Sequence, residues 1–536
     1  MNQPKVILIV LDGWGYSEVK HGNAILQAKK PNFDRLWREY PHTLLSASGE
    51  EVGLPWGEIG SSEVGHLAMG SGQIIYQELP RVSKAIRDGD FFRNPILLNA
   101  LDYAKSHKSN LHLIGLVSSG GVHSHIDHLY ALLELLKRKK FHQPSFIQMF
   151  TDGRDTPTKV AASYVEKLES KIATLKLQTK IASVIGRYFA MDRDSHWERT
   201  FATYDCLTTA KGERANSAKD AVLNAYHRNE SDEFIKPTVI YGREQLNNFW
   251  QKLAKEHLNS NVQPVGPINN NDALIFFNFR SERMRQIVET FLFPQQNYKN
   301  KILRKNLFIS TLTEYDRAVP VNVAFPPEGI KNSLSKVLSE KKFKQLHLAE
   351  TEKYAHATYF FDGGHSNPYS GEEWKIIRSP KVSTYDKKPE MSAPEITNEL
   401  IKNLTKQNYD FVLINFANAD MVGHTGVLSA GIKAVEAIDK QLGRITQEFP
   451  DSVLMITADH GNAEEMIDKN GDKNTNHSLA PVPLILVGKK FKKEKPNSTA
   501  PPPSGILADI APTILHLLNE EKSPEMIGDD LTSSLV

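Results

Sequence analysis

Two patterns of apolar and polar positions alternate along the chain: short continuous apolar runs, and longer stretches with helical periodicity. The apolar runs cover residues 6–11, 111–116, 146–150, 181–185, 273–277, 411–416, 453–458 and 484–487. Runs of this length predict strands, and continuous apolar character is typical of strands that are covered on both faces. We therefore expect buried and largely parallel sheets.

Helical periodicity fills the stretches between these runs. The leucines from 129 to 136 recur at i, i+3, i+4 and i+7, which places them on one face of a helix. Ser392 and Glu395, with Pro394 between them, predict a capping box at the start of another helix. Strands that alternate with helices indicate an α/β architecture.

Composition narrows this picture modestly. The chain has 536 residues, more than one hydrophobic core usually supports, so we expect two domains. Its net charge of +2 produces no field that would favour nucleic acid or a membrane as a partner. The single cysteine, Cys206, excludes an intramolecular disulfide, and the apolar run 6–11 is too short for a signal sequence. A soluble cytoplasmic protein is the expectation.

Candidate chemistry gathers around Ser62, which lies in the glycine-flanked segment 60–66. A serine is a poor nucleophile unless a base or a metal ion activates it. Side chains of metal-ligand type occur near both ends of the chain: Asp12, Asp420, His424, Asp459, His460 and His477. Together with Ser62 they indicate phosphoryl transfer at a site with two divalent cations.

Each candidate ligand also has an ordinary explanation when taken alone. Asp12 before a glycine is typical of a turn, and Asp420 with His424 is typical of a surface pair. Their joint occurrence at predicted strand ends favours a metal site, because open α/β sheets bind ligands there. Oxygen and nitrogen ligands without cysteine favour Mn²⁺, with Zn²⁺ and Mg²⁺ as alternatives.

The candidate ligands suggest a division into two sets, which the sequence alone does not prove. One ion would take Asp420, His424 and His477. The other would take these four: Asp12, Asp459, His460 and the Ser62 oxygen.

None of the candidate metal ligands lies in the middle of the chain, which carries a separate group of arginines instead. A core formed by both chain ends and interrupted by an inserted domain explains this distribution better than two domains in tandem. We predict a metal-binding domain from residues 1–78 and 314–536, and an inserted substrate-binding α/β domain from residues 79–313.

Nine sequence blocks, taken in order, resemble one family. They cover residues 10–15, 60–66, 121–125, 152–157, 186–194, 277–283, 349–354, 419–426 and 457–462. This series resembles the cofactor-independent (2,3-bisphosphoglycerate-independent) phosphoglycerate mutases of the alkaline phosphatase superfamily. The resemblance implies an alkaline-phosphatase-like core sheet, an inserted transferase domain, a monomer, and interconversion of 3-phosphoglycerate and 2-phosphoglycerate in glycolysis and gluconeogenesis.

The resemblance also implies roles for individual residues. Ser62 matches the nucleophile that becomes phosphorylated, and Lys353 matches a lysine near the phosphoryl group. The two ligand sets match those of two metal ions, in the division given above. The residues that match the substrate-binding set are His123, Arg154, Asp155, Arg187, Arg193, Arg280 and Arg283. Arginine forks suit the carboxylate and the phosphate of such a substrate.

These assignments predict a two-step transfer. Ser62 takes the phosphoryl group, the bound glycerate turns, and its 2-hydroxyl takes the group back while Asp155 shuttles the proton. The domains would have to close and exclude water, because the phosphoserine would otherwise hydrolyse.

Three alternatives remain at this stage: a metal-dependent phosphomonoester hydrolase, a phosphopentomutase-like isomerase, and a catalytically silent binding protein on this fold. Ser61 and Gln73 stand where the family usually has asparagine and arginine, and neither departure removes a candidate ligand.

Overall fold

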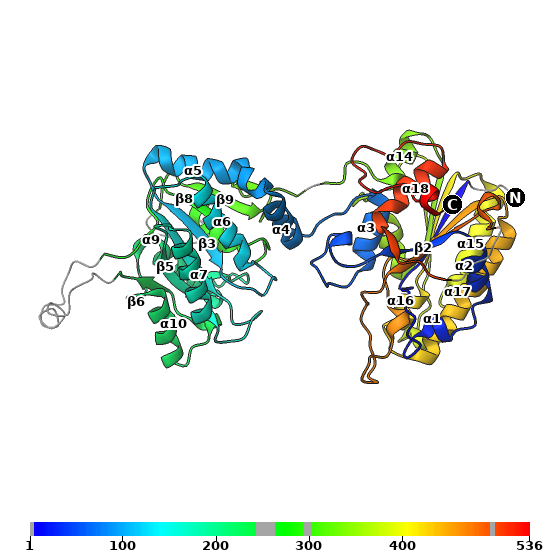
Figure 1. The fold of residues 1–536 in the computed structure, drawn as a ribbon, viewed down its shortest axis with the longest axis horizontal. Helices are drawn as coiled ribbons and strands as arrows, with labels where there is room; N and C mark the ends of the chain where they lie inside the picture. The colour runs from blue at the N-terminus through cyan, green and yellow to red at the C-terminus, as the bar shows by residue number, and fades with distance from the viewer. Residues whose placement is uncertain (1–4, 243–262, 294–302, 328, 494–498, 536) are drawn as a thin grey trace, which may run out of the picture. The chain divides into compact units, whose positions relative to one another are not determined.

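The computed structural model describes residues 5–242, 263–293, 303–327, 329–493 and 499–535. The chain forms two compact units, one from Met1–Gln77 with Gly329–Val536 and one from Glu78–Glu328. Each unit has an eight-stranded sheet and its own hydrophobic core (Figure 1). The predicted fold class is confirmed: both chain ends form one α/β core, and a second α/β unit is inserted into it.

The sheet of the first unit is mostly parallel. Its strands, in spatial order, are β12 (Glu372–Ile377), β11 (Gln345–Glu350), β13 (Phe411–Phe416), β1 (Val6–Leu11), β14 (Val453–Thr457), β15 (Val482–Val487), β2 (His42–Ser46) and β16 (Pro503–Ile506). The first five run parallel, and β15 is antiparallel to both of its neighbours. The carboxyl ends of β11, β13, β1 and β14 therefore meet at one edge of the sheet.

Helices cover both faces of this sheet. They are α1 (Ala24–Gln27), α2 (Pro31–Glu39), α3 (Ser62–Ser71), α14 (Leu334–Glu340), α15 (Ala393–Lys406), α16 (Asn418–Gly423), α17 (Leu428–Glu448), α18 (Ile510–Leu517) and α19 (Thr532–Leu535). Helices α1, α2 and α15 pack against α17 on one face, while α14 and α18 pack against α3 on the other (Figure 1).

The inserted unit repeats this layered design. Its strands, in spatial order, are β10 (Asn322–Phe325), β9 (Phe308–Thr313), β8 (Ala273–Phe276), β3 (Leu111–Leu116), β4 (Ser145–Thr151), β5 (Lys180–Gly186), β7 (Thr238–Ile240) and β6 (Glu213–Ala215). Its helices are α4 (Glu78–Asp88), α5 (Pro95–His107), α6 (Ile126–Arg138), α7 (Ala161–Thr174), α8 (Arg187–Ala190), α9 (Trp197–Thr209), α10 (Ala218–His227) and α12 (Arg285–Leu292). The carboxyl ends of β8, β3, β4 and β5 lie side by side, because these strands run parallel.

All eight predicted apolar runs correspond to strands of these two sheets, and the runs 273–277 and 453–458 extend one residue beyond theirs. The return to the first unit comes later than residue 314, because β10 pairs with β9 and keeps the chain in the inserted unit.

The capping box predicted at Ser392 is wrong. Ser392 is the N-cap of α15, but its hydroxyl donates to the carbonyl oxygen of Arg378 at 2.9 Å rather than capping the helix. The Ser392 hydroxyl therefore bonds to a residue just beyond the end of β12 instead of to the first turn of α15.

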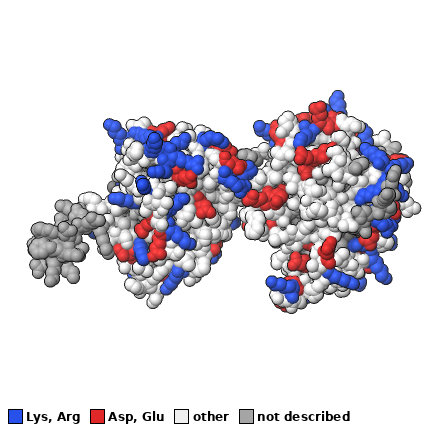
Figure 2. Space-filling model, in the orientation of Figure 1, with Lys and Arg blue, Asp and Glu red and all other residues white. Residues whose placement is uncertain are grey.

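The surface carries no extended region of one charge on the face drawn in Figure 2, where acidic and basic side chains are interspersed over both units. This agrees with the net charge of +2. Among the described residues, no helix is both long and apolar enough to cross a membrane.

Candidate metal centre and active site

Three neighbouring strands of the first unit deliver the predicted acidic ligands to one edge of the sheet. Asp12 directly follows β1, Asp459 and His460 lie just beyond β14, and Asp420 lies in α16 just beyond β13. All four side chains are buried. Because parallel strands end at the same edge, residues far apart in the sequence meet there.

Two glycines allow the backbones of this edge to approach closely. Gly13 has φ +75°, and a Cβ at this position would lie 2.6 Å from Cα of Asp420. A Cβ at Gly65 of α3 would lie 2.6 Å from the carbonyl oxygen of Asp459. Any larger residue at either position would push a candidate ligand away.

The first predicted ligand set lies together. Nε2 of His424 and Nε2 of His477 lie 3.1 and 3.2 Å from Oδ1 of Asp420, and 3.1 Å from each other. Each Nδ1 lies within 2.8 Å of a backbone carbonyl oxygen, that of Thr475 or Gly60. Since a carbonyl only accepts, both Nδ1 atoms carry the hydrogen, and the Nε2 lone pairs converge with the carboxylate, as in a metal site.

The second predicted set surrounds Ser62. Oγ of Ser62, the first residue of α3, lies 2.8 Å from Nε2 of His460 and donates to Oδ1 of Asp12 at 3.3 Å. The same His460 nitrogen lies 3.6 Å from Asp12 and 3.5 Å from Asp459. Asp12, Asp459 and His460 form one compact group of candidate metal ligands.

Lys353 joins the two sets. It ends a short 3₁₀ turn after β11, and its Nζ lies 2.6 Å from Oδ1 of Asp12, from Oδ2 of Asp420 and from Oγ of Ser62. Although burial opposes ionisation, the positive charge of Lys353 holds the pKa of Asp420 well below its usual range.

One lysine does not balance the buried charge of Asp12, Asp420 and Asp459. Unpaired buried carboxylates are costly, so this donor set is suited to divalent cations at both ligand groups.

The predicted substrate-binding residues gather at the strand ends of the inserted unit. His123 follows β3, and its carbonyl oxygen accepts the backbone N–H of Phe279 at 2.9 Å, which joins this loop to the one after β8. Arg187 begins α8 directly after β5 and is buried. Nη1 of Arg187 donates to Oδ1 of Asp152 at 2.7 Å and to Oδ2 of Asp155 at 2.5 Å, beyond the end of β4.

The remaining predicted arginines are more exposed. Arg193 and Arg280 both form ion pairs with Glu282, at 3.0 and 3.3 Å. Arg154 pairs with Glu233 at 3.7 Å. Burial and the surrounding arginines, Arg187 first among them, lower the pKa of Arg283. Arginines close enough to disfavour one another's charge are suited to binding an anion.

Known proteins match the whole chain. Residues 4–522 match the metalloenzyme superfamily. The chain is 46% identical over 538 residues to the 2,3-bisphosphoglycerate-independent phosphoglycerate mutase of Acetivibrio thermocellus, covering 99% of each chain. It is 47% identical over 530 residues to 2,3-bisphosphoglycerate-independent phosphoglycerate mutase 2 of Methanosarcina barkeri, covering 98% of each.

The chain belongs to the 2,3-bisphosphoglycerate-independent phosphoglycerate mutases. A solved structure agrees: the Leishmania mexicana phosphoglycerate mutase at low cobalt concentration is 28% identical, with a TM-score of 0.50 over 99% of this chain and 98% of the other. The family is one of isomerases within a metalloenzyme superfamily, and the two ligand groups of this chain suit divalent cations.

Sequence reasoning assigned no role to the residues that hold the three buried aspartates in place. Nδ2 of Asn415 donates to Asp12 at 2.8 Å, and Nδ2 of Asn462 donates to Asp420 at 2.9 Å. Nδ1 of His66 lies 3.3 Å from Asp459. His66 and Asn462 lie in blocks that carried the family resemblance. Asn415 had a signal of its own, because it is a polar residue inside the apolar run of β13.

Asp152 was likewise not assigned a role. Besides Arg187, its Oδ1 accepts the backbone N–H groups of Arg154 and Asp155 at 3.1 and 3.0 Å, and its Oδ2 accepts the Ser118 hydroxyl at 2.6 Å. Asp152 therefore orients the turn that carries Arg154 and Asp155, two of the predicted substrate-binding residues.

His123 is expected to stay neutral at the pH of the cell. Burial, with Arg187 repelling a second positive charge, lowers its pKa from 6.5 to about 4, although Asp155 opposes the shift. The unfolded chain binds this proton near pH 6.5, so the contribution of His123 to folding stability falls as the pH drops from 6.5 towards 4. An NMR titration of the ring measures the midpoint. A value near 6.5 in the folded enzyme would contradict this environment.

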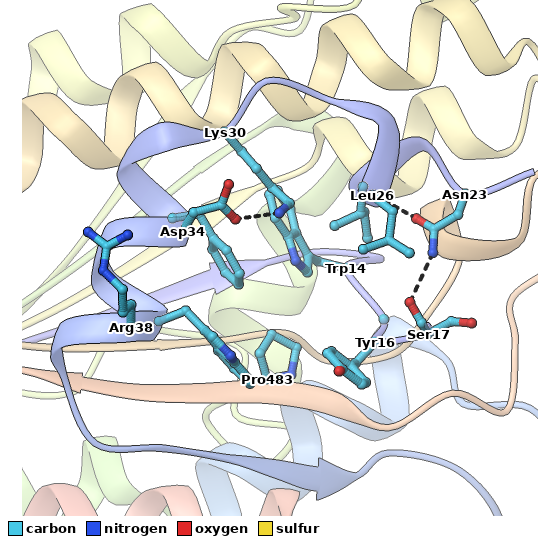
Figure 3. A pocket seen from close by; sticks show the side chains of 13 residues that line it. Trp14, Tyr16, Ser17, Asn23, Leu26, Lys30, Asp34, Arg38 and Pro483 are labelled. Carbon is cyan, nitrogen blue, oxygen red and sulfur yellow. Dashed lines mark hydrogen bonds and ion pairs between the residues drawn. The ribbon is translucent and has the colours of Figure 1, made fainter. Parts of the chain in front are cut away.

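A separate aromatic pocket of about 320 Å³ lies in the first unit (Figure 3). Trp14, Phe33 and Trp37 are among the residues that line it, and Lys30 pairs with Asp34 at its rim. None of the predicted site residues lines this pocket.

Proposed function

We propose that this protein interconverts 3-phosphoglycerate and 2-phosphoglycerate without 2,3-bisphosphoglycerate, through a phosphoserine at Ser62. It would do so as a cytoplasmic monomer with two divalent cations, for which Mn²⁺ suits the oxygen and nitrogen donor set. The observation that carries the proposal is the position of Oγ of Ser62, 2.6 Å from Nζ of Lys353 and 2.8 Å from Nε2 of His460, between two groups of metal-ligand side chains.

The residues of the first unit act on the phosphoryl group. When bound, the cations would stabilise charge on the phosphoryl oxygens and favour the deprotonated form of the Ser62 hydroxyl. Oγ of Ser62 bonds to phosphorus as the bond from phosphorus to the substrate's 3-oxygen breaks. Nζ of Lys353 donates hydrogen bonds to the transferring group, and its positive charge offsets the charge that develops there.

The residues of the inserted unit act on the glycerate. The 3-oxygen takes up a proton as it leaves, and in the second half the 2-hydroxyl gives up a proton as it bonds to phosphorus. Asp155 is the proposed carrier: it gives a proton to the 3-oxygen in the first half and takes one from the 2-hydroxyl in the second, so it ends the cycle as it began. Arg187 holds Asp155 at 2.5 Å and offers further N–H donors, while neutral His123 lies 3.8 Å from the same carboxylate.

Replacing Arg187 by lysine is expected to lower kcat/KM by about 10- to 100-fold, mainly through a higher KM. Lysine keeps the charge but loses the planar fork that serves two acceptors at once. Steady-state kinetics with 3-phosphoglycerate measures the effect. Arg138→Lys is the matched control, because Arg138 is an exposed arginine of the same unit that pairs with Glu134 and lies over the ring of Phe92, away from the predicted substrate-binding residues. Equal kinetics for the two variants would remove Arg187 from the proposed substrate site.

Removing and restoring the metal distinguishes the proposed mutase activity from the alternative functions. Chelated enzyme should be inactive, and Mn²⁺ should restore formation of 2-phosphoglycerate from 3-phosphoglycerate with no 2,3-bisphosphoglycerate added. Both 2-phosphoglycerate and free phosphate are followed. Phosphate as the main product would indicate a hydrolase. Absence of both products would point to a different phosphorylated substrate, as for a phosphopentomutase-like isomerase, or to a silent binding protein.

A further inference from the structure

A buried carboxylate lies among the loops that carry the candidate metal ligands. Glu464 belongs to the 3₁₀ turn Ala463–Glu465 beyond β14, and the residue is only 2% exposed. It is in neither ligand set, and no step of the proposed mechanism uses it. A carboxylate is costly to bury, so the groups that donate hydrogen bonds to it indicate what it does there.

The donors to this carboxylate come from three separate segments. Oε2 of Glu464 accepts the backbone N–H of Gly15 at 3.0 Å and that of Asn462 at 2.9 Å. Oε1 accepts the Ser478 hydroxyl. Gly15 lies in the loop after β1, Asn462 in the loop after β14, and Ser478 in the segment that precedes β15. All of these residues are buried, so a donor that lost its acceptor there would be left unpaired at a cost in free energy.

Two of the donors are close in sequence to candidate ligands of different sets. Gly15 comes three residues after Asp12, which belongs to the second ligand set. Ser478 directly follows His477, which belongs to the first. One side chain therefore connects the backbone beside Asp12 with the backbone beside His477.

Asn462 links Glu464 to the ligands by a further route. Its backbone N–H donates to Glu464, while its Nδ2 donates to Oδ1 of Asp420 at 2.9 Å. Asn462 also comes only two residues after His460. Without the Glu464 acceptor this loop would have to rearrange to satisfy the buried N–H group, and the donor to Asp420 would move with it.

The carboxylate fits closely between these segments. A Cβ at Gly15 would lie 2.3 Å from Cδ of Glu464, and a Cβ at Gly461 would lie 2.5 Å from its Oε1. Gly461 also accepts the backbone N–H of Ser478 at 3.0 Å. The two glycines therefore allow the approach that brings the carboxylate within hydrogen-bond distance of all three segments.

A second buried carboxylate of the same unit has similar contacts away from the metal ligands. Asp439 of α17 is 3% exposed and accepts the backbone N–H groups of Phe33 and Asn32 at 2.7 and 3.3 Å. It thereby joins α17 to α2, and neither helix carries a candidate ligand. Asp439 connects two helices of the scaffold, whereas Glu464 connects ligand-bearing loops.

We propose that Glu464 is a positioning residue for both cations: its carboxylate fixes the loop of Asp12 relative to the segment of His477, and so sets the separation of the two ligand sets. The separation matters because two cations stabilise the attacking and the leaving oxygen of one phosphoryl group only when they are held at a suitable distance. This inference rests on the two-cation site of the proposed function, but not on the phosphoserine route.

Replacing Glu464 by alanine should weaken the binding of Mn²⁺ by about 10- to 100-fold, as is typical when a group that orients metal ligands is lost. Titration calorimetry of metal-free enzyme with Mn²⁺ alone measures the affinity. Glu464→Gln should bind Mn²⁺ as wild type does. Its amide oxygen can accept from Gly15 and Asn462 while its NH₂ group donates to the Ser478 hydroxyl. Failure of glutamine to restore the affinity that alanine loses would overturn the role in hydrogen bonding.

Asp439→Ala is the matched control. It also removes a buried acceptor of backbone N–H groups, so it should lower the midpoint of thermal unfolding as Glu464→Ala does, but it should leave the Mn²⁺ affinity unchanged. An equal loss of affinity in Asp439→Ala would overturn the proposal in favour of a general loss of stability.

Ser478→Ala tests the same connection with the removal of a single hydroxyl, and it serves where Glu464→Ala does not fold. It should weaken Mn²⁺ binding by about 10-fold. Wild-type affinity in both Ser478→Ala and Glu464→Ala would overturn the inference and leave the mutase proposal standing. A failure of the mutase proposal would appear instead in the products formed from 3-phosphoglycerate, and the differences in Mn²⁺ affinity would remain.

Discussion

Replacing Ser62 by alanine is expected to abolish formation of 2-phosphoglycerate, with a loss of at least about 10⁴-fold in kcat. Oγ of Ser62 is the atom that would bond to phosphorus, and no neighbouring side chain can take its place as the nucleophile. Its contacts with Lys353, His460 and Asp12 would be lost as well, but those side chains keep one another as partners. The product is measured from 3-phosphoglycerate, and the phosphoserine by intact mass after rapid quenching.

Ser61→Ala is the matched control for this prediction. The Ser61 hydroxyl is also at the start of α3, but it accepts the backbone N–H of Val64 and caps the helix. Its loss should lower the free energy of unfolding by about 1 kcal/mol and leave most of the activity. A Ser62→Ala enzyme that still turned over, or a wild-type enzyme that never carried a phosphoryl group, would exclude the phosphoserine route.

Replacing Asp420 by asparagine should remove one metal ion and lower kcat by at least about 10³-fold. Oδ1 of Asp420 is the atom on which His424 and His477 converge, and Oδ2 accepts from Lys353 at 2.6 Å. Asparagine keeps the shape but loses the charge that attracts the cation. Bound metal per chain and turnover are both measured at saturating Mn²⁺.

Asp451→Asn provides the control for Asp420. Asp451 is an exposed carboxylate of the same unit that pairs with Lys489 at 2.5 Å, so its neutralisation should change neither metal content nor turnover. If Asp420→Asn retained full metal content but lost activity, the carboxylate would act on the substrate rather than on the ion. Full activity with full metal content would remove it from the site altogether.

Sequence reasoning succeeded best where burial was continuous. The run Val6–Leu11 is completely buried, and the two strands that flank it are apolar except for Asn415 and Thr457, so the local pattern reflects the final environment. β11 was not predicted, because Gln345, His347 and Glu350 interrupt its apolar character. These polar side chains are buried all the same. Only pairing with β12 and β13 makes that segment a strand.

The sequence alone determined the α/β class, the insertion of one unit into another, and the identity of the candidate ligands around Ser62. Those conclusions depend on residue type and on position relative to apolar runs, both of which are local. The tertiary structure decided which atoms converge. Lys353 comes to lie between Asp12 and Asp420, and Asn415 beside Asp12, because parallel strands distant in the sequence end at one edge of a sheet. Distances across that edge depend on strand order and register, which no local pattern encodes.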